Sequence, residues 1–313
     1  MIFKINLTIF VYLCGQFKKT DTMIRENNTG LIIAFACLSF IMITLSLASC
    51  DKNESQNSES SEPGRIEEHE SMVEIWCGSE GARIYGQMYL PEQFGNKLPA
   101  VILSHSSSLT HKAMAGYADS LSRHGYASYC FDFRGGSKES LSEGSVDDMT
   151  LFTEIDDLKT VLQTIGSLDY VDPSRIYLMG SSLGGVVSAL VAEDIPEAVA
   201  GLILFYPAFN ISSIVGRFSG VQTAFTESLK DYDIMAHIGS YPGPVLIVQG
   251  TKDIIVPTSV AEEASAKYSD VELHFIEGAN HGFNKANLGS FGSLVSGDYD
   301  AEVMPLVYDW LGE

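Results

Sequence analysis

The stretch PAVILSHS, residues 99–106, is a nearly continuous apolar run, and such a run predicts a β-strand buried on both faces of a sheet. ASYCFDFRGG, residues 127–136, is a second run of this kind. The segment that follows, residues 148–168, carries its apolar residues at the spacing of a helix. Strands that alternate with helices predict parallel pairing with right-handed crossovers, so we expect an α/β sheet.

The same alternation continues over most of the chain. Further strands are expected at residues 72–76, 83–90, 174–181, 200–208, 243–250 and 271–278. Further helices are expected at residues 113–125, 182–193, 259–269 and 301–312. We therefore predict a doubly wound, mostly parallel sheet that is preceded by an antiparallel pair of strands.

One connection is longer than the others. Residues 210–242 separate two predicted strands by far more than one short helix, and they follow a strand end at which such sheets bind ligands. We predict a short lid insertion there, and an extra helix packed on the sheet edge is the alternative. Aromatic residues that could line a pocket under this lid are Phe218, Phe225, Tyr232 and Tyr241.

The N-terminal part of the chain has the composition of a targeting segment. Residues 31–49 carry no charge, and Arg25 and Glu26 precede them, which predicts a secretory signal within residues 1–49. Leu47-Ala48-Ser49-Cys50 resembles the lipobox of bacterial lipoproteins, which implies cleavage before Cys50 and a lipid on its sulfur and amine. An uncleaved membrane anchor is the alternative. Translation could begin at Met1 or at Met23.

These features predict a protein of the bacterial cell envelope that is tethered by lipid and faces the periplasm or the exterior. The lipidated Cys50 would be followed by an acidic segment that has too few apolar residues to fold, so residues 50–70 are expected to form a disordered linker. Residues 71–313 are then long enough for one large domain.

The charge, the cysteine positions and the absence of metal-binding spacings bear on which ligands we expect. The formal net charge is −21, so no basic stripe is expected that could neutralise the phosphates of a nucleic acid. Within the predicted domain, Cys77 and Cys130 lie in apolar strand-like runs and are expected to be buried free thiols, with a disulfide between them as the alternative. No CxxC or HExxH spacing supports a metal site.

The stretch MGSSLGG, residues 179–185, joins a predicted strand to a predicted helix. Gly180-Ser181-Ser182-Leu183-Gly184 fits the pattern G-x-S-x-G, whose central serine lies on a strained turn with its hydroxyl above the sheet. Ser182 is therefore the candidate nucleophile. Ser181 occupies the variable position and is expected to point elsewhere.

A serine hydroxyl needs a base, and in this fold the partners follow it in the order acid, histidine. His281 lies in a loop just past a predicted strand, whereas His274 lies within that strand and His237 within the predicted lid. We therefore expect His281 to be the base. For the acid, Asp253 follows the strand VLIVQG and is favoured over Glu277.

The remaining requirement is a pair of donors for the oxyanion. One should be the backbone N–H of Leu183, the residue after the nucleophile, and the other should come from the loop at residues 105–108. A polar loop whose serines cap themselves is the alternative for these residues.

Several ordered motifs resemble the α/β-hydrolase superfamily over residues 71–313: IYGQMYLPE, VILSHSSS, FDFRGGSKES, MGSSLGG, FYPA, VLIVQGTKDIIVP and IEGANHGF. Within the superfamily they are most similar to bacterial cinnamoyl (feruloyl) esterases and dienelactone-hydrolase-like proteins. The resemblance implies that Ser107 supplies the second oxyanion donor, although Ser106 replaces the usual glycine before it. It also implies hydrolysis of small or aryl carboxylic esters through an acyl-enzyme, with no cofactor.

Two other functions remain open. One is a peptidase of the prolyl-oligopeptidase-like group, which shares the serine turn and the order of the three residues. The other is a non-catalytic binding protein on a hydrolase fold. The sequence predicts neither the natural ester nor the oligomeric state.

Overall fold

The computed structural model describes residues 72–78, 81–216, 223–285 and 297–312, all of which lie in the unit Glu68–Glu313. The predicted signal segment, Cys50 and the predicted linker at 51–70 lie outside the described residues. None of the described helices is both long and apolar enough to cross a membrane.

The described strands form one sheet in the order β1-β2-β4-β3-β5-β6-β7-β8. The strands β1 and β2 pair antiparallel, β2 pairs antiparallel with β4, and the remaining pairs are parallel, which confirms the predicted architecture. The strand bounds are β1 Met72–Cys77, β2 Ile84–Tyr89, β3 Leu98–Ser104, β4 Ala127–Phe131, β5 Val171–Ser181, β6 Gly201–Phe205, β7 Val245–Gly250 and β8 Val271–Ile276.

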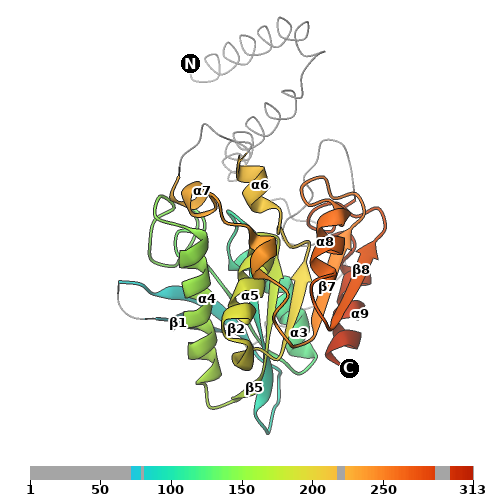
Figure 1. The fold of residues 1–313 in the computed structure, drawn as a ribbon. Helices are drawn as coiled ribbons and strands as arrows, with labels where there is room; N and C mark the ends of the chain where they lie inside the picture. The colour runs from blue at the N-terminus through green and yellow to red at the C-terminus, as the bar shows by residue number, and fades with distance from the viewer. Residues whose placement is uncertain (1–71, 79–80, 217–222, 286–296, 313) are drawn as a thin grey trace, which may run out of the picture. The chain divides into compact units, whose positions relative to one another are not determined.

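Helices cover both faces of this sheet (Figure 1). Their bounds are η1 His111–Ala113, α3 Ala115–Arg123, α4 Leu151–Gly166, α5 Leu183–Asp194, η2 Pro196–Ala198, α6 Ile211–Gly216, α7 Ala224–Ser228, η3 Ile234–His237, α8 Thr258–Ser265 and α9 Asp300–Leu311. The helix expected at 113–125 is divided into η1 and α3 by Met114.

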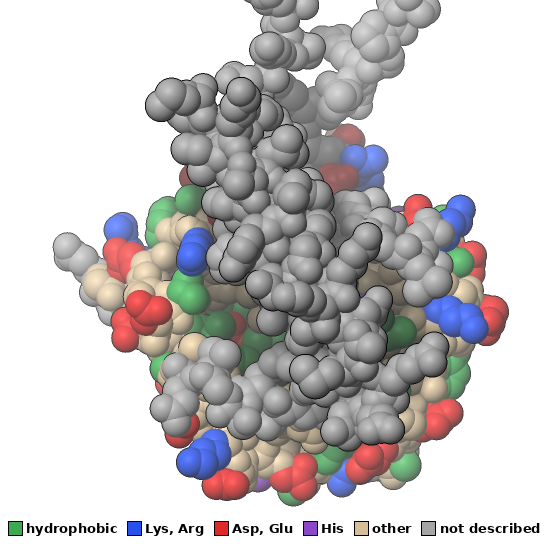
Figure 2. All heavy atoms as spheres, turned by 90° about the horizontal axis from the view of Figure 1, so that it is seen from above, with side chains coloured by type: hydrophobic (Ala, Val, Ile, Leu, Met, Phe, Trp, Pro, Cys, Tyr) green, Lys and Arg blue, Asp and Glu red, His purple; other side chains and the backbone are tan. Residues whose placement is uncertain are grey.

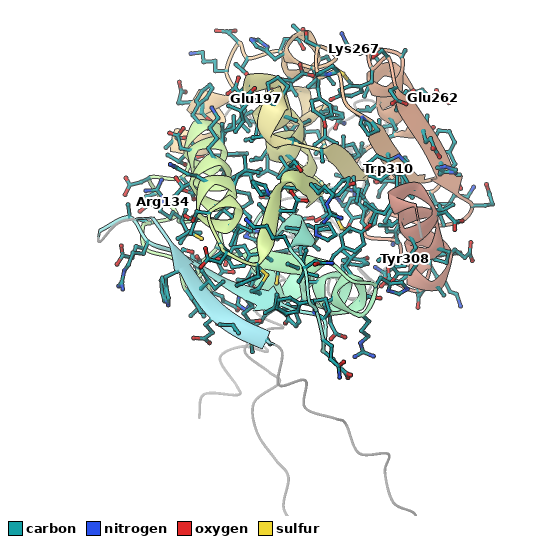
Figure 3. The ribbon with its side chains drawn as sticks, turned by 90° about the horizontal axis from the view of Figure 1, so that it is seen from below. Arg134, Glu197, Glu262, Lys267, Tyr308 and Trp310 are labelled. Atoms are coloured by element: carbon teal, nitrogen blue, oxygen red, sulfur yellow. The ribbon has the colours of Figure 1, made fainter. Side chains whose placement is uncertain are left out.

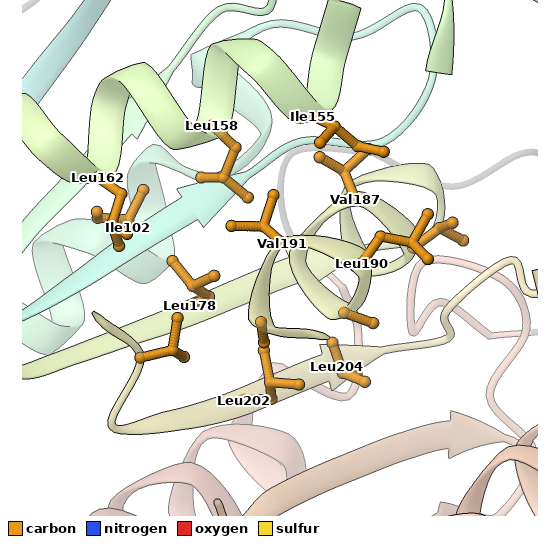
Figure 4. Close-up of a cluster of buried hydrophobic side chains, with 14 of the residues drawn as sticks. Ile102, Ile155, Leu158, Leu162, Leu178, Val187, Leu190, Val191, Leu202 and Leu204 are labelled. Atoms are coloured by element: carbon orange, nitrogen blue, oxygen red, sulfur yellow. The ribbon is translucent and has the colours of Figure 1, made fainter. Parts of the chain in front are cut away.

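The core consists of two hydrophobic layers, one on each side of the sheet. Side chains of α4, α5 and α8 pack on one face, where Leu158 and Val191 belong to one buried cluster with strand residues such as Ile102 (Figure 4). Side chains of α3 and α9 pack on the other face against Val101 and Leu103. Successive residues of β3 point to opposite layers, so the continuous apolar run at 99–106 arises because both faces of that strand are buried.

The helix α9 closes the second layer with aromatic contacts. Figure 3 shows Tyr308 and Trp310 on this helix. Tyr308 stacks on His124 with ring centroids 3.7 Å apart, and Trp310 meets Tyr177 edge-on. Cys130 in β4 is buried in this same layer and Cys77 in the layer on the other side of the sheet, and both are free thiols. The expectation of buried free cysteines is thereby met, and the alternative of a disulfide between them is wrong.

The connection between β6 and β7 holds α6, α7 and η3, with residues 217–222 outside the described part. Tyr241 in this connection is 2% exposed and donates its hydroxyl to the carbonyl oxygen of Val199 at 2.9 Å. Tyr241 is therefore a core residue and not a lining residue of a pocket. Phe225 and Tyr232 are partly buried against the same core, and Phe218 lies outside the described residues.

Candidate active site

Ser182 occupies the sharp turn between β5 and α5. Its backbone has φ 52° and ψ −113°, a combination that side-chain-bearing residues rarely adopt. The strain is held by hydrogen bonds on both sides of the residue, since its N–H donates to Phe205 O at 2.9 Å and its carbonyl accepts from Gly185 and Ala208 at 3.1 Å. The turn is therefore fixed by its surroundings.

The glycines of this turn are required by close backbone approach. A Cβ atom at Gly180 would lie 2.2 Å from the carbonyl oxygen of Gly184, and one at Gly184 would lie 2.3 Å from that of Ser104. Any larger residue would push α5 away from the ends of β5 and β3. The G-x-S-x-G spacing thus has a packing reason here, in addition to its value as a motif.

The structure brings the three predicted residues into one hydrogen-bonded chain. His281 Nε2 lies 3.1 Å from Ser182 Oγ, and His281 Nδ1 lies 2.7 Å from Asp253 Oδ2. A carboxylate only accepts, so Nδ1 donates to Asp253 and Nε2 is the nitrogen that can accept the serine proton. A histidine in this tautomer can act as a general base toward Ser182.

Asp253 is held by four donors. Its Oδ1 accepts from the backbone N–H groups of Ile255 and Val256 at 2.8 and 2.9 Å, and its Oδ2 accepts from Gln249 Nε2 at 3.0 Å as well as from His281. The side chain of Asp253 is fully buried. These donors fix the carboxylate in the plane that the imidazole needs.

Sequence reasoning did not identify Gln249. The same Nε2 also donates to the carbonyl oxygen of Val256 at 3.0 Å, whereas Gln249 Oε1 is buried and finds no partner among the described residues. The side-chain amide of Gln249 is oriented by the acceptors that face its Nε2. The signal was a single polar residue inside the apolar strand VLIVQG.

The alternative residues lie elsewhere. Glu277 is exposed and follows the end of β8. His274 in β8 hydrogen-bonds with Glu272 at 3.3 Å, and His237 in η3 stacks on Tyr232. None of these side chains hydrogen-bonds with Ser182 in the part of the chain that the structure describes.

The predicted oxyanion loop forms a tight turn. The N–H of Leu109 donates to the carbonyl oxygen of Ser106 at 3.2 Å, so Ser107 and Ser108 occupy the centre of the turn, and Ser108 has φ 62°. Among the described residues, the backbone N–H groups of Ser107 and Leu183 have no acceptor. Both donors remain available to a ligand.

Tyr206 is a second residue that the sequence analysis missed. Its ring lies against the imidazole of His281, with centroids 4.6 Å apart, and its backbone has φ 37°. Burial raises the pKa of Tyr206, while the hydroxyls of Ser181 and Ser106 act in the opposite direction with a smaller effect. The side chain is therefore a neutral phenol that supports one face of the imidazole.

The chain is similar in sequence to one protein family and to several individual proteins. The sequence model of the family described as "Serine aminopeptidase, S33" matches residues 95–232. Protein Rv2307c of Mycobacterium tuberculosis is 27% identical over 200 residues, which cover 63% of this chain and 67% of that protein. An acylamino-acid-releasing enzyme of Arabidopsis thaliana is 26% identical over 160 residues, 44% of this chain and 21% of that enzyme.

Solved structures share the fold. The ferulic acid complex of Est1E from Butyrivibrio proteoclasticus superimposes with a TM-score of 0.64 at 21% sequence identity, over 76% of this chain and 97% of that one. The architecture is thus the α/β-hydrolase fold, and the family match and the relatives support a serine hydrolase.

Proposed function

We propose that the protein is a serine esterase that cleaves small or aryl carboxylic esters. The observation that carries this proposal is the chain of two hydrogen bonds, 3.1 Å from Ser182 Oγ to His281 Nε2 and 2.7 Å from His281 Nδ1 to Asp253 Oδ2. A serine in a strained turn, a histidine in the accepting tautomer and a buried carboxylate are the three parts that acyl transfer requires.

In the proposed reaction, His281 takes the proton of Ser182 as Oγ attacks the ester carbonyl carbon. The carbonyl oxygen becomes an oxyanion and accepts hydrogen bonds from the N–H groups of Leu183 and Ser107. His281 then gives its proton to the leaving alcohol oxygen, and an acyl group remains on Ser182. Water attacks this ester with His281 again as base, which releases the carboxylic acid and restores the serine.

The substrate class rests on similarity and on the site. Est1E, which binds ferulic acid, shares the fold over most of this chain and supports an aryl ester as substrate. Phe225 and Tyr232, partly buried in the connection between β6 and β7, are the described aromatic residues of the predicted lid. We propose that a lid at residues 210–242 lines an acyl pocket with these two side chains.

A peptidase is the second candidate. The family match to serine aminopeptidases and the similarity to an acylamino-acid-releasing enzyme favour it. The same three residues would cleave an amide. The two functions are therefore distinguished by comparing substrates with alcohol and amine leaving groups. Faster turnover of aminoacyl amides than of aryl esters would favour the peptidase.

The proposed location is the bacterial cell envelope, with the hydrolase domain tethered through lipid on Cys50. The uncharged segment at 31–49 and the lipobox-like Leu47–Cys50 support this proposal. Incorporation of labelled palmitate that disappears in Cys50→Ala is the expected result. Labelling that persists in Cys50→Ala would contradict the lipid anchor.

The function is tested with a panel of acetyl, butyryl, feruloyl and p-coumaroyl esters, together with an aminoacyl p-nitroanilide. We expect ester hydrolysis by the wild type and a loss of about 10⁴-fold or more in Ser182→Ala. Hydrolysis that survives in Ser182→Ala would exclude the proposed nucleophile. A wild type that hydrolyses none of these substrates and does not react with a fluorophosphonate would instead favour a non-catalytic binding protein.

A further inference from the structure

The oxyanion loop and the nucleophile turn belong to segments about 75 residues apart, and a pair of side-chain hydroxyls joins them. Ser106 Oγ lies 2.9 Å from Ser181 Oγ, and it also donates to the carbonyl oxygen of Ser181 at 3.3 Å. Ser106 directly precedes the expected donor Ser107, and Ser181 directly precedes the nucleophile Ser182. The link therefore acts on the residues next to the reacting groups.

Each end of this link is itself held. The carbonyl oxygen of Ser106 accepts from Leu109 N at 3.2 Å and from His105 Nδ1 at 2.8 Å. The N–H of Phe133 donates to His105 Nε2 at 3.2 Å, so Nδ1 must carry the ring proton of a neutral His105. Burial lowers the pKa of His105, which keeps the ring neutral.

The Ser181 end is almost completely enclosed. Ser181 is 2% exposed, and its hydroxyl also contacts Met114 Sδ at 3.5 Å. The phenol of Tyr206 interacts with the hydroxyls of both Ser181 and Ser106. Tyr206 in turn lies against the ring of His281. The hydroxyl pair thus lies among residues that touch the proposed nucleophile, base and oxyanion donor.

In the family that the sequence resembles, a glycine usually precedes the second oxyanion donor. A glycine at position 106 could not form the hydrogen bond to Ser181 because it has no side chain. The two segments also meet through their backbones, since Ser104 pairs with Gly180 in the sheet and Gly184 lies against the carbonyl oxygen of Ser104. These contacts limit how closely the segments approach but do not fix the direction of the Ser107 N–H. The hydrogen bonds that Ser106 O accepts hold the peptide plane of the Ser107 N–H within its own loop, and the hydrogen bond between the Ser106 and Ser181 hydroxyls orients that loop relative to the nucleophile turn.

We propose that Ser106 and Ser181 are positioning residues whose mutual hydrogen bond holds the N–H of Ser107 in the orientation that binds the oxyanion. This inference rests on the proposed hydrolase function. Because the restraint acts on the transition state, losing it should lower kcat while KM changes little. The two hydroxyls form one link, so removing the second after the first should have little further effect.

The test is a double-mutant cycle with Ser106→Ala, Ser181→Ala and the double variant, measured on p-nitrophenyl acetate. We expect each single variant to lose about tenfold in kcat, which is less than the loss of a whole oxyanion donor, with KM unchanged within about twofold. The double variant should lose no more than either single variant. The affinity for an aryl trifluoromethyl ketone, which forms an oxyanion on Ser182, should fall by the same factor.

Ser104→Ala is the matched control, because Ser104 is buried two residues away and its hydroxyl has no partner among the described residues. It should keep the wild-type kcat, and Ser106→Gly serves as a second variant if Ser106→Ala folds poorly. Losses that multiply in the double variant, or a single variant with wild-type kcat and ketone affinity, would overturn the proposal. Failure of the proposed function itself is distinguishable, since it would leave either Ser182→Ala active or the wild type inactive on every substrate.

Discussion

Two histidine–aspartate pairs lie at the same edge of the sheet, and among the described residues only one of the two imidazoles hydrogen-bonds with a serine hydroxyl. In both pairs Nδ1 of the histidine lies 2.7 Å from a carboxylate oxygen, at His281–Asp253 and at His111–Asp132. The imidazole of His281 is 15% exposed and reaches Ser182, whereas that of His111 is 4% exposed and packs edge-on against Tyr85. No described hydroxyl hydrogen-bonds with His111.

The His111–Asp132 pair has a structural role. Asp132 Oδ1 accepts from both the backbone N–H and Nδ1 of His111, and Oδ2 accepts from the N–H of Leu141 at 2.7 Å. Burial would raise the pKa of Asp132, but His111 and the backbone donors outweigh burial and lower it. The pair joins η1, which follows the oxyanion loop, to the end of β4. The comparison shows that a histidine–carboxylate pair is a candidate general base only where the imidazole is accessible to a ligand and lies next to a nucleophile.

The largest expected difference between the pairs is in activity. His281→Ala should reduce kcat/KM for p-nitrophenyl acetate by about 10⁴–10⁶-fold, with little loss of stability, because it removes the proposed base. His111→Ala should lower the free energy of unfolding by about 1–3 kcal/mol, because a buried carboxylate loses one of its donors. Urea unfolding and initial rates on the two purified variants measure both effects.

Equal losses of activity in His281→Ala and His111→Ala, at temperatures where both variants are folded, would remove the distinction between the two pairs. His274→Ala is the control for a histidine on an edge strand, since His274 contacts only Glu272 among the described hydrogen-bonding partners. It should retain wild-type rates.

The two aspartates, Asp253 and Asp132, should also differ in their effect on activity, but by a smaller factor than the two histidines. Asp253→Asn should lower kcat by about 10⁴-fold, because the amide favours the histidine tautomer that cannot accept the serine proton. Asp132→Asn should cost about 1–3 kcal/mol of stability, because three donors surround this carboxylate and an amide nitrogen must face one of them. Steady-state rates and chemical unfolding separate the two outcomes. An active Asp253→Asn would contradict the proposed role of the acid.

A third buried carboxyl sharpens the comparison because it lacks the donors of the other two. Glu154 in α4 is 1% exposed, and its Oε2 has no partner among the described residues. Burial, and then the charge of Asp157, raise the pKa of Glu154 well above its ordinary value. The folded state therefore keeps a proton that the unfolded state loses above a pH of about 4.3.

This carboxyl gives the smallest of the predicted effects. Its contribution to stability is fully present below the unfolded pKa and is lost as the pH rises toward the folded pKa. Glu154→Gln removes that dependence, so its free energy of unfolding relative to the wild type should increase from pH 4 to pH 8. Urea unfolding at several pH values measures the difference. A difference that stays constant with pH would mean that Glu154 is ionised in the folded state.

The fold and the three candidate catalytic side chains could be predicted because they follow from local pattern and chain order. Apolar runs identify the buried strands, and Ser182, Asp253 and His281 each lie in the turn or loop that follows a strand. The carboxyl ends of parallel strands meet at one edge, so these residues converge. The view in Figure 2 shows acidic and basic side chains mixed around the visible rim of one face.

The supporting contacts could not be predicted, because they depend on side-chain direction rather than on position in the chain. Gln249 contacts Asp253 only because its amide turns along the end of β7. Tyr206 reaches His281 through a backbone with positive φ, which the letters FYPA do not reveal. The hydrogen bond between Ser106 and Ser181 joins the oxyanion loop to the last residue of β5, and the distance between them is set by the packing of α5.

The central claim is that Ser182, and not its neighbour, carries the reactive hydroxyl. A fluorophosphonate probe followed by peptide mass spectrometry tests this claim most directly. We predict one adduct on Ser182 in the wild type and in Ser181→Ala, no adduct in Ser182→Ala, and slow labelling in His281→Ala. An adduct on Ser181, or labelling at the wild-type rate without His281, would contradict the account.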